Sequence, residues 1–249
     1  LIKYIMNASA QPSIYRTVWK KKPALRAVYK DYYNIIQQWQ TNGRTLEIGA
    51  GPGNAEHIDP DMVLTDISFA PWLDITCDAQ ALPFRDRTFS NIVMVDVLHH
   101  ISRPAHFLTE AERVLKTGGR LLVLEPGITP ISYIVYKFFH TEDVDLSTDP
   151  LDMSRPTTKD PYEGNQAIAT RLFGREKHRI SMITPKMKLI RKTWISLFAY
   201  PLSGGFKPWS LLPSFMVSKI LFFERLILPI FGPICAFRLF VVLEKNGDT

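Results

Sequence analysis

The chain has 249 residues, of which 46% are hydrophobic, and its formal net charge is +6 at pH 7. This length and composition suit one large globular domain with a substantial core, and they exclude a disordered chain. The excess of basic residues permits attraction to anionic partners, but it does not choose between nucleic acid, phospholipid headgroups and an acidic small molecule.

The N-terminal residues 1–10 lack the apolar segment behind a basic start that marks a secretory signal. Cys77 and Cys235 lie far apart in the sequence. We expect them to be free thiols in a reducing compartment rather than a disulfide. The sequence therefore predicts a cytoplasmic protein.

Apolar side chains recur at helical spacing between residues 11 and 40, and Pro23 interrupts the pattern. We expect helices on both sides of this proline.

Residues 45–53, Thr-Leu-Glu-Ile-Gly-Ala-Gly-Pro-Gly, predict a strand that enters a cofactor-binding turn. Glycines at alternate positions let the backbone bring its N–H groups close to a ligand. A dinucleotide fingerprint would need its third glycine at position 54, which is asparagine. Glu47 would repel a pyrophosphate, but it suits a ligand with a cationic amino group and a sulfonium. The loop therefore favours S-adenosylmethionine over a dinucleotide.

Acidic residues follow the next predicted strands. Asp66 ends the run Met62-Val63-Leu64-Thr65, at a strand tip where a carboxylate can accept hydrogen bonds from ribose hydroxyls. Asp78 and Ala79 precede Leu-Pro-Phe at 82–84, and Asp96 ends a strongly apolar strand at 92–95.

In these motifs the chain resembles the class I S-adenosylmethionine-dependent methyltransferases, in particular the branch with an Asp-Ala…Leu-Pro-Phe motif. The resemblance covers about residues 40–126 and includes the turn Thr117-Gly118-Gly119-Arg120. It implies an α/β fold with a Rossmann-like, seven-stranded, mostly parallel sheet and helices on both faces. The last strand is expected to be antiparallel and to lie at the sheet's edge.

Two departures from the family pattern concern the first crossovers. Few residues separate Gly53 from Asp66 and Asp66 from Asp78, and prolines interrupt both stretches. We expect both crossovers to be shortened. Trp72, in the second, is either a ring that stacks on the adenine or a plug for the shortened core.

The resemblance implies a set of cofactor-binding residues that runs from the methionine end of the ligand to its adenine. They are Glu47, Gly49, Ala50, Gly51, Asp66, Ile67, Asp78 and Ala79, with Asp96 bordering the methyl-transfer site.

We divide the chain into four parts. Residues 1–40 form a helical cap, which either covers the cofactor pocket or simply packs on the sheet. Residues 41–126 form the S-adenosylmethionine-binding core, 127–185 an acceptor or lid insertion, and 186–249 the C-terminal strands and helix that complete the same domain.

Two further hypotheses concern the insertion. Its basic residues either face a phosphate or carboxylate of the acceptor or lie on a solvated surface. They include Arg155, Lys159, Arg171, Arg175, Lys177, His178 and Arg179. The carboxylates between Glu142 and Asp149 match no calcium loop, so we predict a solvated loop and no metal site.

Methyl transfer from a sulfonium mainly requires alignment of the acceptor and exclusion of water. A hydroxyl acceptor would also need a general base, and histidine is the natural one. The candidates are His140, which lies in the acceptor segment and is preferred, His100 and its neighbour His99.

In the C-terminal part we expect a strand after Lys188, a helix over 215–228 and a final strand over 237–244. Phe, Leu, Ile and Pro abound between 206 and 237. A buried helix is the default interpretation, and contact with the inner face of a membrane is the alternative.

The leading hypothesis is S-adenosylmethionine-dependent methyl transfer to oxygen, nitrogen or carbon of a small-molecule, lipid-linked or glycan acceptor in a biosynthetic pathway. An RNA or protein methyltransferase, and a non-catalytic binding protein that kept the fold, are the alternatives. The basic residues are not interleaved with stacking aromatics, which disfavours nucleic acid. The oligomeric state stays open.

Overall fold

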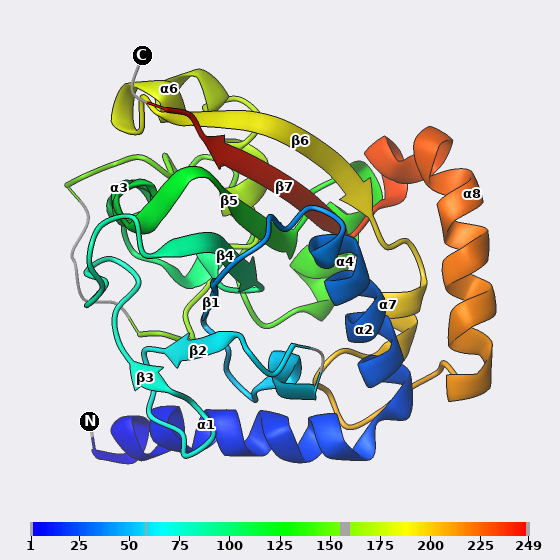
Figure 1. Cartoon of the computed structure of the whole chain (residues 1–249). Helices are drawn as coiled ribbons and strands as arrows, with labels where there is room; N and C mark the ends of the chain where they lie inside the picture. Colours follow the sequence, from blue (N-terminus) through cyan, green and yellow to red (C-terminus); the bar gives the residue numbers. More distant parts are fainter. Residues whose placement is uncertain (1, 58, 155–159, 248–249) are drawn as a thin grey trace.

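The structure, a computed structural model, describes residues 2–57, 59–154 and 160–247. In this part of the chain, seven strands form one sheet in the order β3-β2-β1-β4-β5-β7-β6 (Figure 1). β7 is antiparallel to β5 and β6, and the other paired strands are parallel. The strands are β1 (Thr45–Ile48), β2 (Val63–Asp66), β3 (Ile75–Thr76), β4 (Phe89–Val95), β5 (Leu115–Pro126), β6 (Met187–Ile195) and β7 (Arg238–Lys245). The expected Rossmann-like sheet is confirmed.

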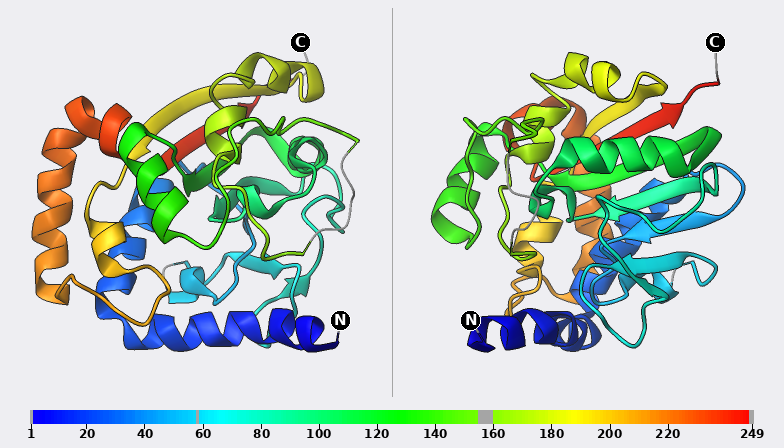
Figure 2. Two further views of the ribbon diagram at one scale, coloured as in Figure 1. Left: turned by 180° about the vertical axis from the view of Figure 1, so that it is seen from behind. Right: turned by 90° about the vertical axis from the view of Figure 1, so that its left-hand side faces the viewer.

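Helices cover both faces of this sheet (Figure 2). The α-helices are α1 (Ile2–Lys21), α2 (Pro23–Gln37), α3 (Pro104–Val114), α4 (Pro130–Phe139), α5 (Ile168–Leu172), α6 (Lys177–Ile183), α7 (Ala199–Ser203) and α8 (Val217–Cys235). The short 3-10 helices are η1 (Asn54–His57), η2 (Leu98–His100) and η3 (Ser214–Met216). The predicted break at Pro23 is confirmed, with proline in the first turn of α2.

Alternate side chains of the central strands supply two cores. Ile92 and Met94 of β4 pack on the face that α3, α5 and α6 cover. Val93 and Val95 pack on the opposite face, which α2, α7 and α8 cover. Burial on both faces explains why the sequence of β4 is apolar throughout rather than alternating.

The first two crossovers are short, as expected. Between β1 and β2 the chain forms the 3-10 helix η1, and residues 67–74 between β2 and β3 form turns and bends. The carboxyl ends of β1 and β2 are therefore not covered by long helices of their own crossovers.

The expected position of the last strand is wrong, because β7 lies inside the sheet and β6 forms its edge. Residues 239–243 of β7 are apolar and fully buried. In β6, by contrast, Lys188, Arg191 and Lys192 are exposed. Charged residues suit an edge strand, and a strand that is apolar on both faces suits an interior position.

The C-terminal helix α8 is longer than expected. It continues through Pro229 and Pro233 to Cys235 instead of ending before the first proline. Within the described ranges, no helix has the length and apolarity needed to cross a membrane. Cys77 and Cys235 are free thiols, as predicted.

Candidate active site

A large cavity lies at the carboxyl ends of β1, β2 and β4, where open α/β sheets bind their ligands. It encloses about 830 Å³. Its walls also include residues of α1, α2 and α4, the segment 200–209 and the start of β7. The cap, the core and the insertion all contribute to one space.

The glycine turn forms one end of this cavity. Gly49, Gly51 and Gly53 have φ values of 69°, 47° and 73°, a region that side-chain-bearing residues seldom adopt. A methyl group on Gly49 would lie 2.2 Å from Val97. The backbone N–H of Gly51 donates to Asp66 Oδ2 at 2.9 Å, so the turn is tied to the end of β2.

Glu47 is buried at the end of β1 with only 2% of its surface exposed. Its Oε1 accepts a hydrogen bond from the Tyr33 hydroxyl of α2, and its Oε2 has no hydrogen-bond partner among the described residues. Burial raises the pKa of Glu47 to about 7. A buried carboxylate with an unsatisfied oxygen is complementary to a cationic ligand group.

The other cofactor candidates also line the cavity. Ala50, Asp66, Ile67, Asp78 and Ala79 follow the ends of the first three strands in chain order. Asp66 is held by the Gly51 N–H and, through Oδ1, by the Ser68 N–H at 2.8 Å.

Trp72 lies beside the glycine turn. It is absent from the cavity wall, and its indole N–H donates to the Gly51 carbonyl at 2.9 Å. The guanidinium of Arg16 lies over its ring at 4.4 Å. Trp72 therefore supports the glycine turn from behind.

Asp96 joins residues from distant parts of the chain. Its φ of 59° is unusual for a residue other than glycine, and such strained backbone often marks a functional site. Oδ2 accepts from the Tyr29 hydroxyl of α2 at 2.9 Å, and Oδ1 pairs with Arg238 of β7. The Arg238 guanidinium also lies over the Tyr200 ring at 3.9 Å.

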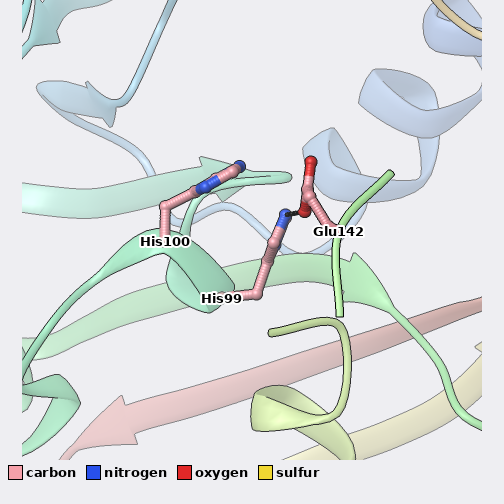
Figure 3. A group of neighbouring side chains, drawn as sticks. All are labelled: His99, His100 and Glu142. Carbon is pink, nitrogen blue, oxygen red and sulfur yellow. Dashed lines mark ion pairs between the residues drawn. The ribbon is translucent and has the colours of Figure 1, made fainter. Parts of the chain in front are cut away.

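His99 is clamped between two carboxylates. Its Nδ1 lies 2.6 Å from Glu125 at the end of β5, and its Nε2 lies 3.1 Å from Glu142 (Figure 3). Burial alone would lower the pKa of His99, but the two carboxylates raise it to about 10. The imidazolium is therefore charged at neutral pH, donates from both nitrogens and is unsuited to accept a proton.

The ligand atoms of His99, His100 and Glu142 lie within 4.8 Å of one another, close enough to hold a metal ion. Both ring nitrogens of His99 are already engaged by carboxylates. The ion pairs alone explain this arrangement.

His100 and His140 both line the cavity, but they present different atoms. The Nδ1 of His100 lies 3.2 Å from the Glu163 carbonyl, which can only accept, so Nδ1 carries the proton and Nε2 is free of one. The Nδ1 of His140 accepts from the Glu142 N–H at 3.2 Å, so its neutral ring carries the proton on Nε2. Burial and the charge of His99 lower the pKa of His100 to about 4, and burial also lowers the pKa of His140.

Among the described residues, the arginines and lysines of segment 160–185 are not in the cavity wall. Arg171 pairs with Glu176, and Arg179 pairs with Glu176 and Asp149. Arg175, Lys177 and His178 are likewise absent from the wall, and Arg155 and Lys159 lie outside the described residues. The insertion contributes other residues instead, namely Val135, Tyr136, Phe139, His140, Thr141, Glu142, Pro161, Tyr162 and Gln166.

Several site residues had no signal in the sequence. Tyr29 and Tyr33 lie one turn apart on α2, but this spacing equally describes a helix that packs in a core. Arg238 stands in an apolar strand, and Glu125 ends another. Only the fold brings these side chains to Asp96 and His99.

Part of the chain that forms this site is similar to known proteins. Residues 46–123, which include the glycine turn and the ends of β1 to β4, match the family model described as "Methyltransferase domain". This part of the chain is similar to a methyltransferase domain, and its strands belong to the Rossmann-like sheet. The match ends before α4, so it does not include the insertion that lines the rest of the cavity.

Two curated relatives of the methyltransferase domain are ubiquinone/menaquinone biosynthesis C-methyltransferases. The protein from Ruegeria sp. (strain TM1040) is 51% identical over 51 residues, which are 20% of this chain and 20% of the relative. The protein from Citrobacter koseri is 44% identical over 69 residues, 26% of this chain and 28% of the relative. The chain thus spans 20% of the length of the first relative and 28% of the length of the second.

Among solved structures, a SAM-dependent methyltransferase from Archaeoglobus fulgidus is similar with a TM-score of 0.48 and 12% sequence identity. The similarity covers 88% of this chain and 94% of that one.

Proposed function

We propose that this protein transfers a methyl group from S-adenosylmethionine to a small, ring-bearing biosynthetic intermediate. The observation that carries the proposal is that one cavity extends from the glycine turn past Asp96 to the aromatic residues Tyr136 and Tyr200. A donor at one end and an acceptor at the other would meet beside Asp96.

The residues at the first end fit the methyl donor. The unsatisfied oxygen of Glu47 suits the ligand's amino group, and the space around Gly51 is open to a ligand. Glu47, Gly49, Ala50 and Gly51 would hold the methionine end. Asp66 with Ile67 would hold the ribose, and Asp78 with Ala79 the adenine.

S-adenosylmethionine, when bound, supplies an electrophilic methyl group, so the protein has to align the acceptor and exclude water. Tyr136 and Tyr200 are aromatic walls suited to a planar ring. The bare Nε2 of His100 would accept a hydrogen bond from the acceptor, and the Nε2–H of His140 would donate one to it. Both histidines stay candidates for the base.

The names of the two relatives favour ring carbon of a quinone-type intermediate as the methylated atom. The aromatic wall supports the same class of acceptor. Oxygen and nitrogen acceptors, and lipid-linked or glycan intermediates, would be screened beside it.

Calorimetric titration with S-adenosylmethionine and, separately, with NAD tests the donor site. We expect the protein to bind the first and not the second. Gly51→Arg should weaken S-adenosylmethionine binding about 100-fold or more, because the new side chain fills the donor end and the residue has a positive φ.

Gly118→Arg is the matched control, because Gly118 has a φ of 73° and open space around it. It is exposed and lies outside the cavity wall. Equal affinities in both variants would refute the donor site. Binding without transfer of labelled methyl to any acceptor would favour a non-catalytic protein instead.

A further inference from the structure

Helix α8 turns an apolar face to solvent. Many of its exposed side chains are large and apolar, and together with Phe215 of η3 we call them the apolar stripe. The stripe consists of Phe215, Phe222, Phe223, Leu226, Ile230, Phe231 and Ile234. Ile230 is 71% exposed, and Phe215 is 74% exposed. An ordinary surface helix would turn polar residues outward here.

The opposite side of α8 fixes this orientation. Glu224 is 2% exposed, and its carboxylate accepts hydrogen bonds from the backbone N–H groups of Phe198 and Ala199 at the start of α7. Rotating α8 to bury the apolar stripe would break these bonds. The hydrogen bonds of the buried Glu224 therefore hold α8 in the orientation that exposes the apolar stripe.

Helix α4 extends the apolar surface. It contacts α8, and Figure 2 shows α4 near the C-terminal end of that helix. Ile131, Ile134, Phe138 and Phe139 of α4 are exposed. We call these four residues and the stripe on α8 the α4–α8 face. Clusters of exposed apolar side chains often mark interaction sites.

Within the two segments that carry the α4–α8 face the exposed charges are basic, and one of them, Arg225, pairs with Asp31 of α2. Segments 127–141 and 203–237 contain one carboxylate, and it is the buried Glu224. Their basic residues Lys137, Lys207, Lys219 and Arg225 are exposed. Exposed Phe, Leu and Ile with surrounding Lys and Arg suit the interface of an anionic bilayer.

The cavity meets this surface. Phe139 and Trp209 line the cavity and are 71% and 44% exposed. The Lys207 ammonium donates to the Phe139 carbonyl at 2.9 Å, so segment 203–211 is joined to the end of α4 at the rim. The inner side of α4, with Val135 and Tyr136, forms cavity wall.

We propose that the α4–α8 face binds the surface of an anionic phospholipid bilayer and holds the aromatic end of the cavity against the lipid. An amphipathic acceptor then enters from the bilayer without crossing water. This second part rests on the proposed function, whereas the binding of lipid does not.

Co-sedimentation with vesicles tests the proposal. We expect the protein to bind vesicles of equal parts phosphatidylcholine and phosphatidylglycerol, and to bind phosphatidylcholine alone at least about tenfold more weakly. Phe223→Glu combined with Ile230→Glu should lower binding to the anionic vesicles by at least about tenfold, because both side chains leave the apolar stripe.

The control variant, Met182→Glu combined with Leu146→Glu, changes the net charge equally at exposed apolar residues elsewhere, and it should bind as the unchanged protein does. Circular dichroism checks that both variants are folded. Failure of the unchanged protein to bind anionic vesicles, or equal binding by the two double variants, would overturn the proposal.

A second copy of the chain is the other occupant that the experiment can reveal. If the protein is a dimer without lipid, does not bind vesicles and becomes monomeric in the Phe223→Glu, Ile230→Glu variant, the face is a subunit interface and the proposal is wrong. Calorimetry with S-adenosylmethionine in the absence of vesicles tests the donor site separately, because neither residue lines the cavity.

Discussion

The two ends of the cavity are built in different ways. The donor end comes from one continuous stretch, residues 47–97, in which each strand delivers its terminal residues to the same edge of the sheet. The other end combines side chains that are far apart in the sequence, from α2, α4, segment 200–209 and β7. Backbone conformation shapes the first end, and packing between distant elements shapes the second. The ends meet at Asp96, where Tyr29 and Arg238 converge.

The ion pair between Arg238 and Asp96 should contribute strongly to the free energy of unfolding. Arg238 is 3% exposed, and Arg238→Met would leave the partly buried Asp96 without its cation. We expect the free energy of unfolding in urea to fall by about 3 kcal/mol.

Arg179→Met provides the comparison, because Arg179 pairs with Asp149 at the surface, where the two side chains are 35% and 40% exposed. This change should cost less than about 1 kcal/mol. Equal losses in the two variants would mean that the contact between the two ends is no stronger than a surface ion pair.

The clamp around His99 ties the insertion to the core, and it should make stability depend on pH. The pKa of His99 is about 10 in the folded protein against its ordinary value of 6.5, so the folded state retains a proton that the unfolded state releases. The contribution of His99 to the free energy of unfolding is complete below pH 6.5 and is lost as the pH rises toward 10. Urea unfolding should show a fall of about 2 kcal/mol between about pH 7 and pH 9 from this group.

His99→Gln should flatten this decline, whereas the same change at the exposed His178 should leave it intact. If both variants retain the full pH dependence, His99 does not gain a proton on folding. On the acid side, the pKa of Glu142 is lowered to about 2, so its contribution is lost as the pH falls from 4.5 toward 2.

The contrast between the two ends also explains what the sequence could reveal. Glycines at 49, 51 and 53 are required by local backbone conformation, and Asp66 is the last residue of β2, so local patterns identify both. The short crossovers could also be predicted locally, because too few residues separate the first three strands to form a full helix.

Contacts between distant residues gave no such signal. Arg238 belongs to an apolar run, and the sequence does not show which strands pair with this run. For the same reason β7 was wrongly expected at the edge of the sheet. The run of buried apolar residues at 239–243 was the clue that this strand lies inside the sheet. The preference for His140 as base stays a prediction. Which ring nitrogen of His100 carries the proton depends on the Glu163 carbonyl, a partner that the sequence does not reveal.

The smallest effect on stability is expected from a substitution at the start of α4. This helix contributes to the acceptor end of the cavity and not to the donor end. The Thr129 side chain accepts the N–H of Ser132, and the Ser132 side chain accepts the N–H of Thr129, which forms a capping box. Thr129→Ala should lower the free energy of unfolding by about 1 kcal/mol, because the first turn of α4 loses its cap. Urea unfolding measures this loss.

The same variant separates the two ends in binding. Because Thr129 is outside the donor end, the affinity for S-adenosylmethionine should stay unchanged in calorimetry while transfer to the acceptor slows. Thr109→Ala is the control, because Thr109 is exposed on α3 and bonds only the carbonyl of its own helix at Ala105, so its loss should stay within about 0.5 kcal/mol. A large drop in S-adenosylmethionine affinity in Thr129→Ala would mean that α4 and the glycine turn act as one unit, and the division of the cavity into two independent ends would be wrong.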